Sequence, residues 1–210
     1  MSPAPTLIIL ATAQWHVQGA SAAGDESRPA WPDFRALAQT LELGLDADWP
    51  VVVAAPRWVR QQCAVFAPSV TCIDADVLSP PTHASHWVQA IAQAVQASAQ
   101  ASSWVIMPGP MPNLRPETLA TLQRQLTQQA LVCPSHHMRL GYPLGLSGEF
   151  YSELVRLQSE HDLKRLLSRY PWATFETEDP AVLNVDSLRP MAAAETTRPP
   201  EAYTPGGRPS

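Results

Sequence analysis

Two pairs of histidines are the residues whose spacing first suggests chemistry. His83 and His86 stand three residues apart, so that on one face of a helix their imidazoles could share a metal ion. No third ligand stands near them in the sequence, and we favour a helix N-terminus near Ser85. His136 and His137 are adjacent after an apolar run. Because neighbouring side chains of a strand point to opposite faces, we expect a polar loop there and no chelate.

A second stretch has the position of a functional site, the run Trp104–Leu114. It begins as an apolar strand and ends among three prolines and one glycine. In chains that alternate strands and helices, ligands bind beyond the carboxyl ends of the strands. This run nevertheless holds no charged side chain. It offers the shape of a turn and no side chain that binds phosphate.

The elements that position these residues follow from the hydrophobic spacing. Continuous apolar runs predict buried strands, and apolar residues three and four apart predict helices between them. The strands are 6–10, 51–55, 70–73, 104–107 and 131–133. The helices carry Phe34, Leu37 and Leu41, ended by Gly44; Val59, Cys63 and Phe66; Val88, Ile91 and Val95; and Leu119, Leu122 and Leu126 after Pro116. This alternation predicts an α/β fold with a mostly parallel sheet.

The pattern changes after residue 140. Gly141–Leu146 is typical of a turn or an edge strand. The elements predicted beyond it are a helix with Phe150, Leu154 and Leu157, a helix opened by a capping box at Ser159–Asp162, and closing strands at 173–177 and 182–185. We expect one domain over residues 1–188. The range 189–210 is rich in proline and poor in large apolar residues, so we predict a disordered tail there.

Composition excludes several classes of partner. The net charge is −5, which gives no electrostatic basis for binding nucleic acid or an anionic membrane. No apolar stretch has the length of a membrane span. The widely spaced Cys63, Cys72 and Cys133 are typical of buried thiols in a cytoplasmic protein. The tryptophans at apolar positions, which we assign to the core, are Trp58, Trp87 and Trp104.

Three segments together resemble a known family. Met107–Leu119, Arg139–Ser147 and Val182–Ser187 are similar, in this order, to segments of the molybdenum-cofactor nucleotidyltransferases, the MobA-like and MocA-like group. The resemblance implies a Rossmann-like fold of the nucleotide-diphospho-sugar transferase kind, with helices on both faces of the sheet. It also implies transfer of a nucleoside monophosphate from CTP or GTP to molybdopterin, with Mg²⁺ as the cofactor.

The same resemblance assigns roles to single residues. It places nucleotide contacts at Ala11, Thr12 and Ala13 after the first strand and at Ser85. It places a metal ligand at Asp186, and it places contacts with the acceptor at Arg139, Gly141 and Pro143.

The chain departs from the family pattern at the positions that would carry catalysis. Ala13 stands in place of a glycine of the phosphate loop, and Pro110 stands in place of a metal-binding aspartate. Asn184 begins a hybrid of two family endings. Trp15 lies in the expected ligand loop, where it either plugs the pocket or stacks on a ligand. The only lysine, Lys164, lies on a late helix, far from that loop.

These departures leave three functions open, and we assign no catalytic residue. One is a transferase with weakened catalysis, which would use Mg²⁺. Another is a relative that has lost catalysis, needs no cofactor and binds a nucleotide or a molybdopterin-type ligand. The last is an assembly factor whose partner belongs to molybdoenzyme maturation. The joint loss of the glycine, the cations and the aspartate favours weakened or lost catalysis.

Overall fold

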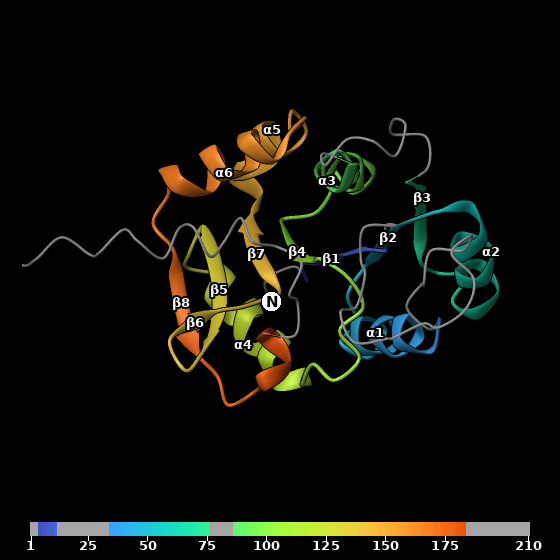
Figure 1. Cartoon of the computed structure of the whole chain (residues 1–210), viewed down its shortest axis with the longest axis horizontal. Helices are drawn as coiled ribbons and strands as arrows, with labels where there is room; N and C mark the ends of the chain where they lie inside the picture. The colour runs from blue at the N-terminus through green and yellow to red at the C-terminus, as the bar shows by residue number, and fades with distance from the viewer. Residues whose placement is uncertain (1–3, 12–33, 76–85, 184–210) are drawn as a thin grey trace, which may run out of the picture.

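An eight-stranded sheet lies at the centre of the molecule (Figure 1). The fold is that of a computed structural model, which describes residues 4–11, 34–75 and 86–183. The strands that run parallel are β1 (Thr6–Leu10), β2 (Val51–Ala55), β3 (Thr71–Asp74), β4 (Ser103–Met107), β5 (Leu131–His136) and β8 (Ala173–Glu176). The antiparallel strands are β6 (Arg139–Leu140) and β7 (Leu144–Ser147). The order is β3-β2-β1-β4-β7-β5-β6, and β8 pairs with β5.

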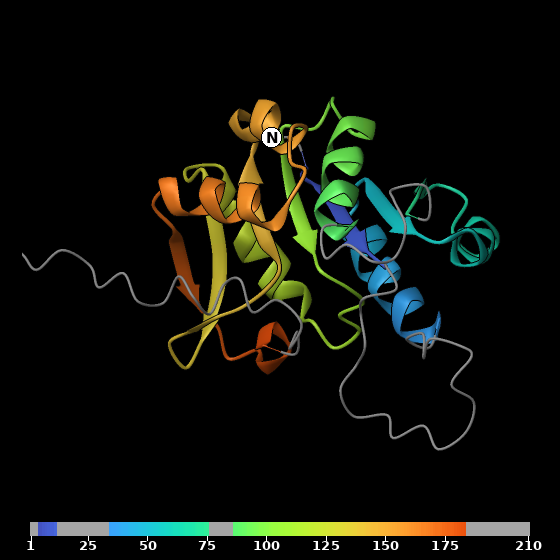
Figure 2. The same ribbon diagram turned by 45° about the horizontal axis from the view of Figure 1, so that its top comes forward.

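Helices cover both faces of this sheet, as expected for a chain of strand and helix alternations. The helices are α1 (Phe34–Asp46), α2 (Arg57–Phe66), α3 (His86–Ala97), α4 (Pro116–Leu126), α5 (Tyr151–Leu154) and α6 (Glu160–Arg169). In Figure 1, α1 and α4 lie on one side of the sheet and α3, α5 and α6 on the other. Figure 2 shows α1 and α3 on opposite sides of β1. The α/β fold class with a mostly parallel sheet is therefore confirmed.

The central strands are buried along their whole length. Every residue of β1, β2 and β4 is buried. This is why their sequences are continuous apolar runs instead of alternating patterns. Trp104 is 1% exposed and stacks on Tyr151, with ring centroids 6.0 Å apart. Trp87 is also buried, so the core assignment of both tryptophans is confirmed.

The segment Gly141–Leu146, predicted to be a turn or an edge strand, differs most from its prediction. It is neither a turn nor an edge strand, because β7 lies between β4 and β5 in the middle of the sheet. The chain turns back through β6 and inserts β7 antiparallel to both neighbours. Gly145 allows α4 to approach closely, since a Cβ there would lie 2.9 Å from Leu122 Cδ2. The glycine marks close packing in the sheet centre.

Other element boundaries also differ from prediction. Helix α1 continues through Gly44 and ends at Asp46, and Asp48 adopts the left-handed conformation that ends it. Gly44 instead allows α1 to pack on β1, since a Cβ there would lie 2.7 Å from Leu7 Cδ2. The predicted closing strand 182–185 begins within a 3₁₀ turn, η3 (Pro180–Leu183).

The segment after β7 contains less regular helix than predicted. It forms a short 3₁₀ turn, η2 (Gly148–Phe150), followed by the four-residue α5. The capping box of α6 is confirmed. The Ser159 hydroxyl accepts a hydrogen bond from the Asp162 backbone N–H, and the Asp162 carboxylate accepts one from the Ser159 backbone N–H. No described helix is long and apolar enough to cross a membrane.

Asp179 joins elements that are far apart in the sequence. Its carboxylate is 1% exposed. It accepts hydrogen bonds from the backbone N–H of Arg115 at 2.8 Å, the Thr118 hydroxyl at 2.9 Å and the backbone N–H of Ala181 at 3.0 Å. Arg115 is the N-cap residue of α4, whose own side chain makes no capping bond. Asp179 thus caps α4 from the far end of the chain, where negative charge also complements the helix dipole.

We expect Asp179→Ala to lower the free energy of unfolding by roughly 2 to 4 kcal/mol, because it leaves buried donors without a partner. Urea denaturation measures this loss. Glu178→Ala, at the exposed neighbouring position, is the matched control and should change stability by less than about 0.5 kcal/mol. Equal stability of the two variants would contradict the capping role.

Candidate functional site

The strand order predicts a ligand-binding crevice at the carboxyl ends of β1 and β4. From β1 the chain moves outward to β2 and β3, and it then crosses to β4 on the other side of β1. Open α/β sheets bind ligands where the winding direction reverses in this way. Ile9 lies opposite Met107 in the register, so the two strands end level with each other. Residues that follow Leu10 and Met107 therefore border the crevice.

The turn from β4 into α4 borders this predicted crevice. Pro108 and Gly109 are buried, and Pro110 is half-buried. The turn is held from α1, because the Thr40 hydroxyl accepts a hydrogen bond from the Met111 backbone N–H at 2.8 Å. The same hydroxyl donates to the Ala36 carbonyl at 2.8 Å, and Thr40 is fully buried. The shape of the turn thus depends on a side chain 71 residues earlier.

The described part of the crevice does not fit a divalent metal ion. Mg²⁺ prefers carboxylate oxygens, whereas the β4 end supplies only Pro108, Gly109 and Pro110 before Met111. Within residues 4–11, 34–75 and 86–183, no group of three or more His, Cys, Asp or Glu side chains could hold a metal. Asp74, at the end of β3, is paired with Arg60. The predicted metal ligand Asp186 lies outside the described residues, as does Asn184.

Only one of the predicted nucleotide contacts falls within the described residues. Ala11 follows β1, is buried, and donates its backbone N–H to the Ala54 carbonyl at 2.8 Å. The position borders the crevice, but its N–H group is already used within the sheet. Thr12, Ala13 and Ser85 lie outside the described residues, and Trp15 does also.

The predicted acceptor contacts separate into packing positions and one exposed side chain. Gly141 and Pro143 are buried. A Cβ at Gly141 would lie 2.5 Å from the Val182 carbonyl oxygen, and the next backbone N–H, of Tyr142, donates to that oxygen at 2.9 Å. Gly141 is therefore required by the close approach of η3. Arg139 lies opposite His136 in the β5–β6 pair, and its side chain is exposed.

A polar cluster that the sequence did not predict lies beside Arg139. The Glu176 carboxylate accepts a hydrogen bond from the Ser135 hydroxyl at 2.7 Å and one from the His137 backbone N–H at 2.6 Å. The Ser135 bond is the largest of the causes that hold the pKa of Glu176 below its usual range. Because 41 residues separate Ser135 from Glu176, no local pattern could have paired them.

The two histidines of this cluster do not point to opposite faces, so that prediction is wrong. Their ring centroids are 4.1 Å apart. The cause is local backbone geometry, since His137 has a φ of 49° and belongs to the turn that follows the strand. The His136 Nδ1 atom lies 2.7 Å from the Thr177 carbonyl oxygen.

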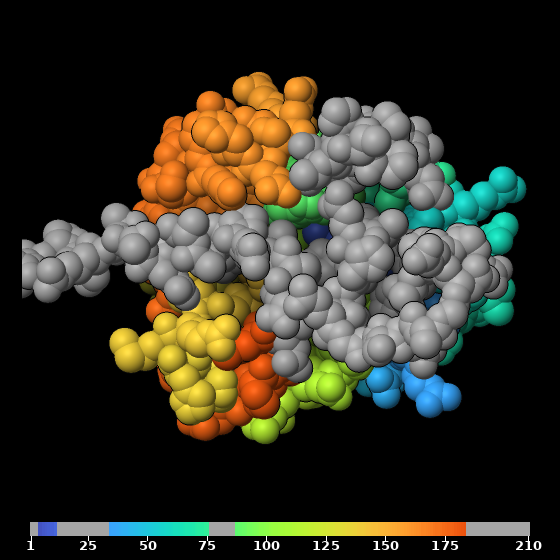
Figure 3. All heavy atoms as spheres, in the orientation of Figure 1, coloured from blue at the N-terminus to red at the C-terminus, as the bar shows by residue number. Residues whose placement is uncertain are grey.

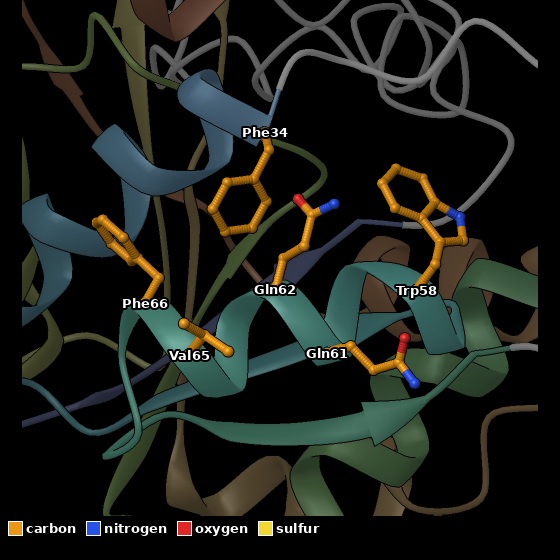
Figure 4. A pocket seen from close by; sticks show the side chains of 6 residues that line it. All are labelled: Phe34, Trp58, Gln61, Gln62, Val65 and Phe66. Carbon is orange, nitrogen blue, oxygen red and sulfur yellow. The ribbon is translucent and has the colours of Figure 1, made fainter.

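A shallow hollow of about 800 Å³ lies between α1 and α2 (Figure 4). It is lined by Phe34, Trp58, Gln61, Gln62, Val65 and Phe66. The prediction that Trp58 belongs to the core is wrong, because this residue is 40% exposed. The apolar spacing of α2 includes Trp58, but Val59 and Cys63 are the residues that face the sheet. Phe34 and Phe66 make an edge-to-face contact across the hollow, with centroids 5.9 Å apart.

Comparison with known proteins supports the α/β fold described above. A family model described as the MobA-like NTP transferase domain matches residues 35–174. The matched range begins after β1 and its following segment, and it ends before η3. A search of curated proteins finds no match.

Several crystal structures share the fold. The protein Rv0371c of Mycobacterium tuberculosis H37Rv superposes with a TM-score of 0.65 and 16% identity, over 92% of this chain and 98% of the other. A structure of Rv0371c in complex with manganese gives 0.60 and 17%, over 83% and 89%. The 4-diphosphocytidyl-2C-methyl-D-erythritol synthase of Anaerococcus prevotii gives 0.58 and 10%, over 91% and 96%.

We expect Thr40→Val to destabilise the fold by roughly 1 to 3 kcal/mol, because the buried Met111 N–H loses its acceptor. Thermal and urea denaturation measure the effect. Thr40→Ser keeps the hydroxyl and is the matched control, so it should retain most of the stability. The anchoring role is wrong if the serine variant loses as much as the valine variant.

Proposed function

Because the chain belongs to the MobA-like NTP transferase domain family, we propose that it binds a nucleotide in the crevice between β1 and β4, with weakened or lost nucleotidyl transfer. The topology supports the location, since the winding direction reverses between these two strands. The backbone turn after β4 is kept in shape by Thr40 and Asp179. These hydrogen bonds hold the backbone of the turn in place, which supports the proposal that the binding site keeps its shape.

The observation that carries the proposal is the composition of that turn. Nucleotidyl transfer from a triphosphate depends on a metal ion that neutralises charge on the phosphate oxygens. Pro110, at the family's aspartate position, supplies no carboxylate and no backbone N–H group. No group of three metal-binding side chains exists in the described part of the chain. The described residues can shape a site for a nucleotide without supplying the metal that its reaction needs.

The resemblance of three sequence segments supports a more specific ligand. It favours CTP or GTP as the nucleotide and a molybdopterin-type molecule on the acceptor side. There, Arg139 is exposed beside the polar cluster of Ser135, His137 and Glu176. An arginine with a free approach from solvent can bind a phosphate of the acceptor. Asp186 is the one metal-binding carboxylate that the resemblance leaves, so Mg²⁺ would be held weakly.

The alternative function is that of a non-catalytic factor in molybdoenzyme maturation. It rests on the same loss of catalytic groups and requires that the crevice and the acceptor side recognise a partner protein or its cofactor. Co-purification of a molybdoenzyme, together with the absence of nucleotide binding, would favour it over the main proposal.

Calorimetry with each of the four nucleoside triphosphates, with and without Mg²⁺, tests the proposal. We expect CTP or GTP to bind with an affinity that Mg²⁺ changes by less than about tenfold, which corresponds to about 1.4 kcal/mol. Absence of any nucleotide binding by the folded protein contradicts the binding site. Pyrophosphate release from CTP or GTP with molybdopterin, at a rate typical of an enzyme, contradicts the weakened catalysis.

We further expect Pro110→Asp to gain no Mg²⁺-dependent pyrophosphate release, because the segment after Leu10 still lacks the family's glycine and cations. Pro110→Ala is the control for removing the proline ring, and circular dichroism confirms that both variants fold. Turnover by the aspartate variant alone would show that Pro110 is the only defect and that the rest of the site is competent.

A further inference from the structure

The helix α2 and the strand β3 form one end of the molecule. In Figures 1 and 3 they lie at the end opposite α6 and β8. Strand β3 is the outermost strand on this side of the sheet and pairs only with β2 among the described strands. α2 packs against it.

Two cysteines face each other between these elements. Arg60 and Cys63 stand three apart and share one face of α2. Cys72 and Asp74 stand two apart and share one face of β3. The ion pair of Arg60 with Asp74 shows that these two faces meet. The Cys63 and Cys72 side chains accordingly lie opposite each other between α2 and β3.

The two thiols differ in burial. Cys63 is fully buried, whereas Cys72 is only partly buried. Among the described residues, the buried Nε atom of Arg60 has no hydrogen-bond partner, while its Nη2 atom is paired with Asp74. The positive charge of Arg60 next to Cys72 favours the thiolate form of that cysteine.

The electrostatics agree with this geometry. The hydrogen bond from Cys63, and next the charge of Arg60, lower the pKa of Cys72 to about 7 against the opposing effect of burial. The hydrogen bond with Cys72 and burial raise the pKa of Cys63, which therefore stays a thiol. Near neutral pH the pair thus holds one thiolate next to one thiol, which is the arrangement that oxidises to a disulfide.

We propose that Cys63 and Cys72 are a reversible thiol–disulfide pair that is oxidised by a hydroperoxide. The Cys72 thiolate attacks one oxygen of the hydroperoxide and breaks the O–O bond, which gives Cys72 sulfenic acid and hydroxide or alkoxide. The Cys63 sulfur then attacks the Cys72 sulfur, forms the S–S bond and displaces the oxygen as water, which takes up the thiol proton. Two thiols lose two electrons, and a dithiol reductant returns them.

The disulfide would join α2 covalently to the outermost strand. This site lies apart from the crevice and uses none of its residues, so its chemistry is independent of nucleotide binding. The third cysteine, Cys133, is buried in β5, where burial raises the pKa to about 12. It serves as an internal reference that should not react.

The test uses the full chain, first reduced and then treated with hydrogen peroxide. After alkylation in denaturant, intact mass should show three alkylated cysteines before oxidation and one after it. Chymotrypsin cleaves after Phe66, between the two cysteines, so the linked peptides can be identified without reduction. Dithiothreitol should restore all three thiols. Three free thiols after peroxide, or a link that involves Cys133 or a second molecule, would overturn the proposal.

Serine variants distinguish Cys72, which attacks the hydroperoxide, from Cys63, which then forms the disulfide. In Cys63→Ser, oxidation should stop at the Cys72 sulfenic acid, which dimedone captures as an adduct. In Cys72→Ser, neither a disulfide nor an adduct should form. An adduct in the second variant, or none in the first while circular dichroism shows a folded protein, would contradict the assignment of Cys72 as the attacking thiol.

The pH dependence of alkylation tests the contribution of Arg60. With iodoacetamide, labelling of Cys72 in the native protein should be half-maximal near pH 7, while Cys133 stays unlabelled. Arg60→Gln should slow labelling at pH 7 by roughly tenfold, because the thiolate loses a neighbouring positive charge. Arg60→Lys should restore most of the rate, and Arg57→Gln, in the same turn of α2, is the matched control. A profile that Arg60→Gln leaves unchanged would show that Arg60 does not stabilise the thiolate.

Discussion

The buried carboxylate of Asp179 is the interaction on which the arrangement of the site depends. It caps the N-terminus of α4 and fixes the first turn of η3. The carbonyl of Val182 in that turn accepts a hydrogen bond from Tyr142, at the entry to β7. One side chain therefore connects the end of the β4–α4 turn, the start of β7 and the last described turn of the chain. These are the segments in which the family resemblance was found.

In the proposed site, the residues that fix the backbone shape differ from the residues that would perform chemistry. The β4–α4 turn is held on one side by Thr40 and on the other by Asp179, and both hold it through backbone N–H groups. Such bonds do not depend on the side chains of the turn itself. A proline can therefore occupy the family's aspartate position while the turn keeps its course. Charge can be lost from a scaffold of this kind without loss of the fold.

Among the described residues, two clusters of ionisable side chains lie at opposite sides of the sheet. On one side, Glu176 is held ionised by Ser135 and by the His137 backbone N–H, close to the exposed Arg139. On the other, the ion pair of Arg60 with Asp74 joins the faces of α2 and β3 that carry Cys63 and Cys72. The apolar crevice lies between them. Binding of a ligand's anionic groups and thiol oxidation would thus take place in separate parts of the molecule.

The sequence by itself determined the elements whose signals are local. The buried strands β1, β2 and β4, the start of α4 at Pro116 and the capping box of α6 depend on residues within one or two turns of each other, and these predictions hold. The strand predicted at 70–73 also forms, as β3, but none of its residues is buried. That Pro110 stands in place of a metal-binding aspartate is an inference from the family resemblance, and it stays a prediction. Only the tertiary structure decided which partners meet across long separations. It placed β7 in the middle of the sheet, exposed Trp58, and paired Asp179 with Arg115 and Cys63 with Cys72, because sheet order and helix packing are set by contacts that no local period encodes.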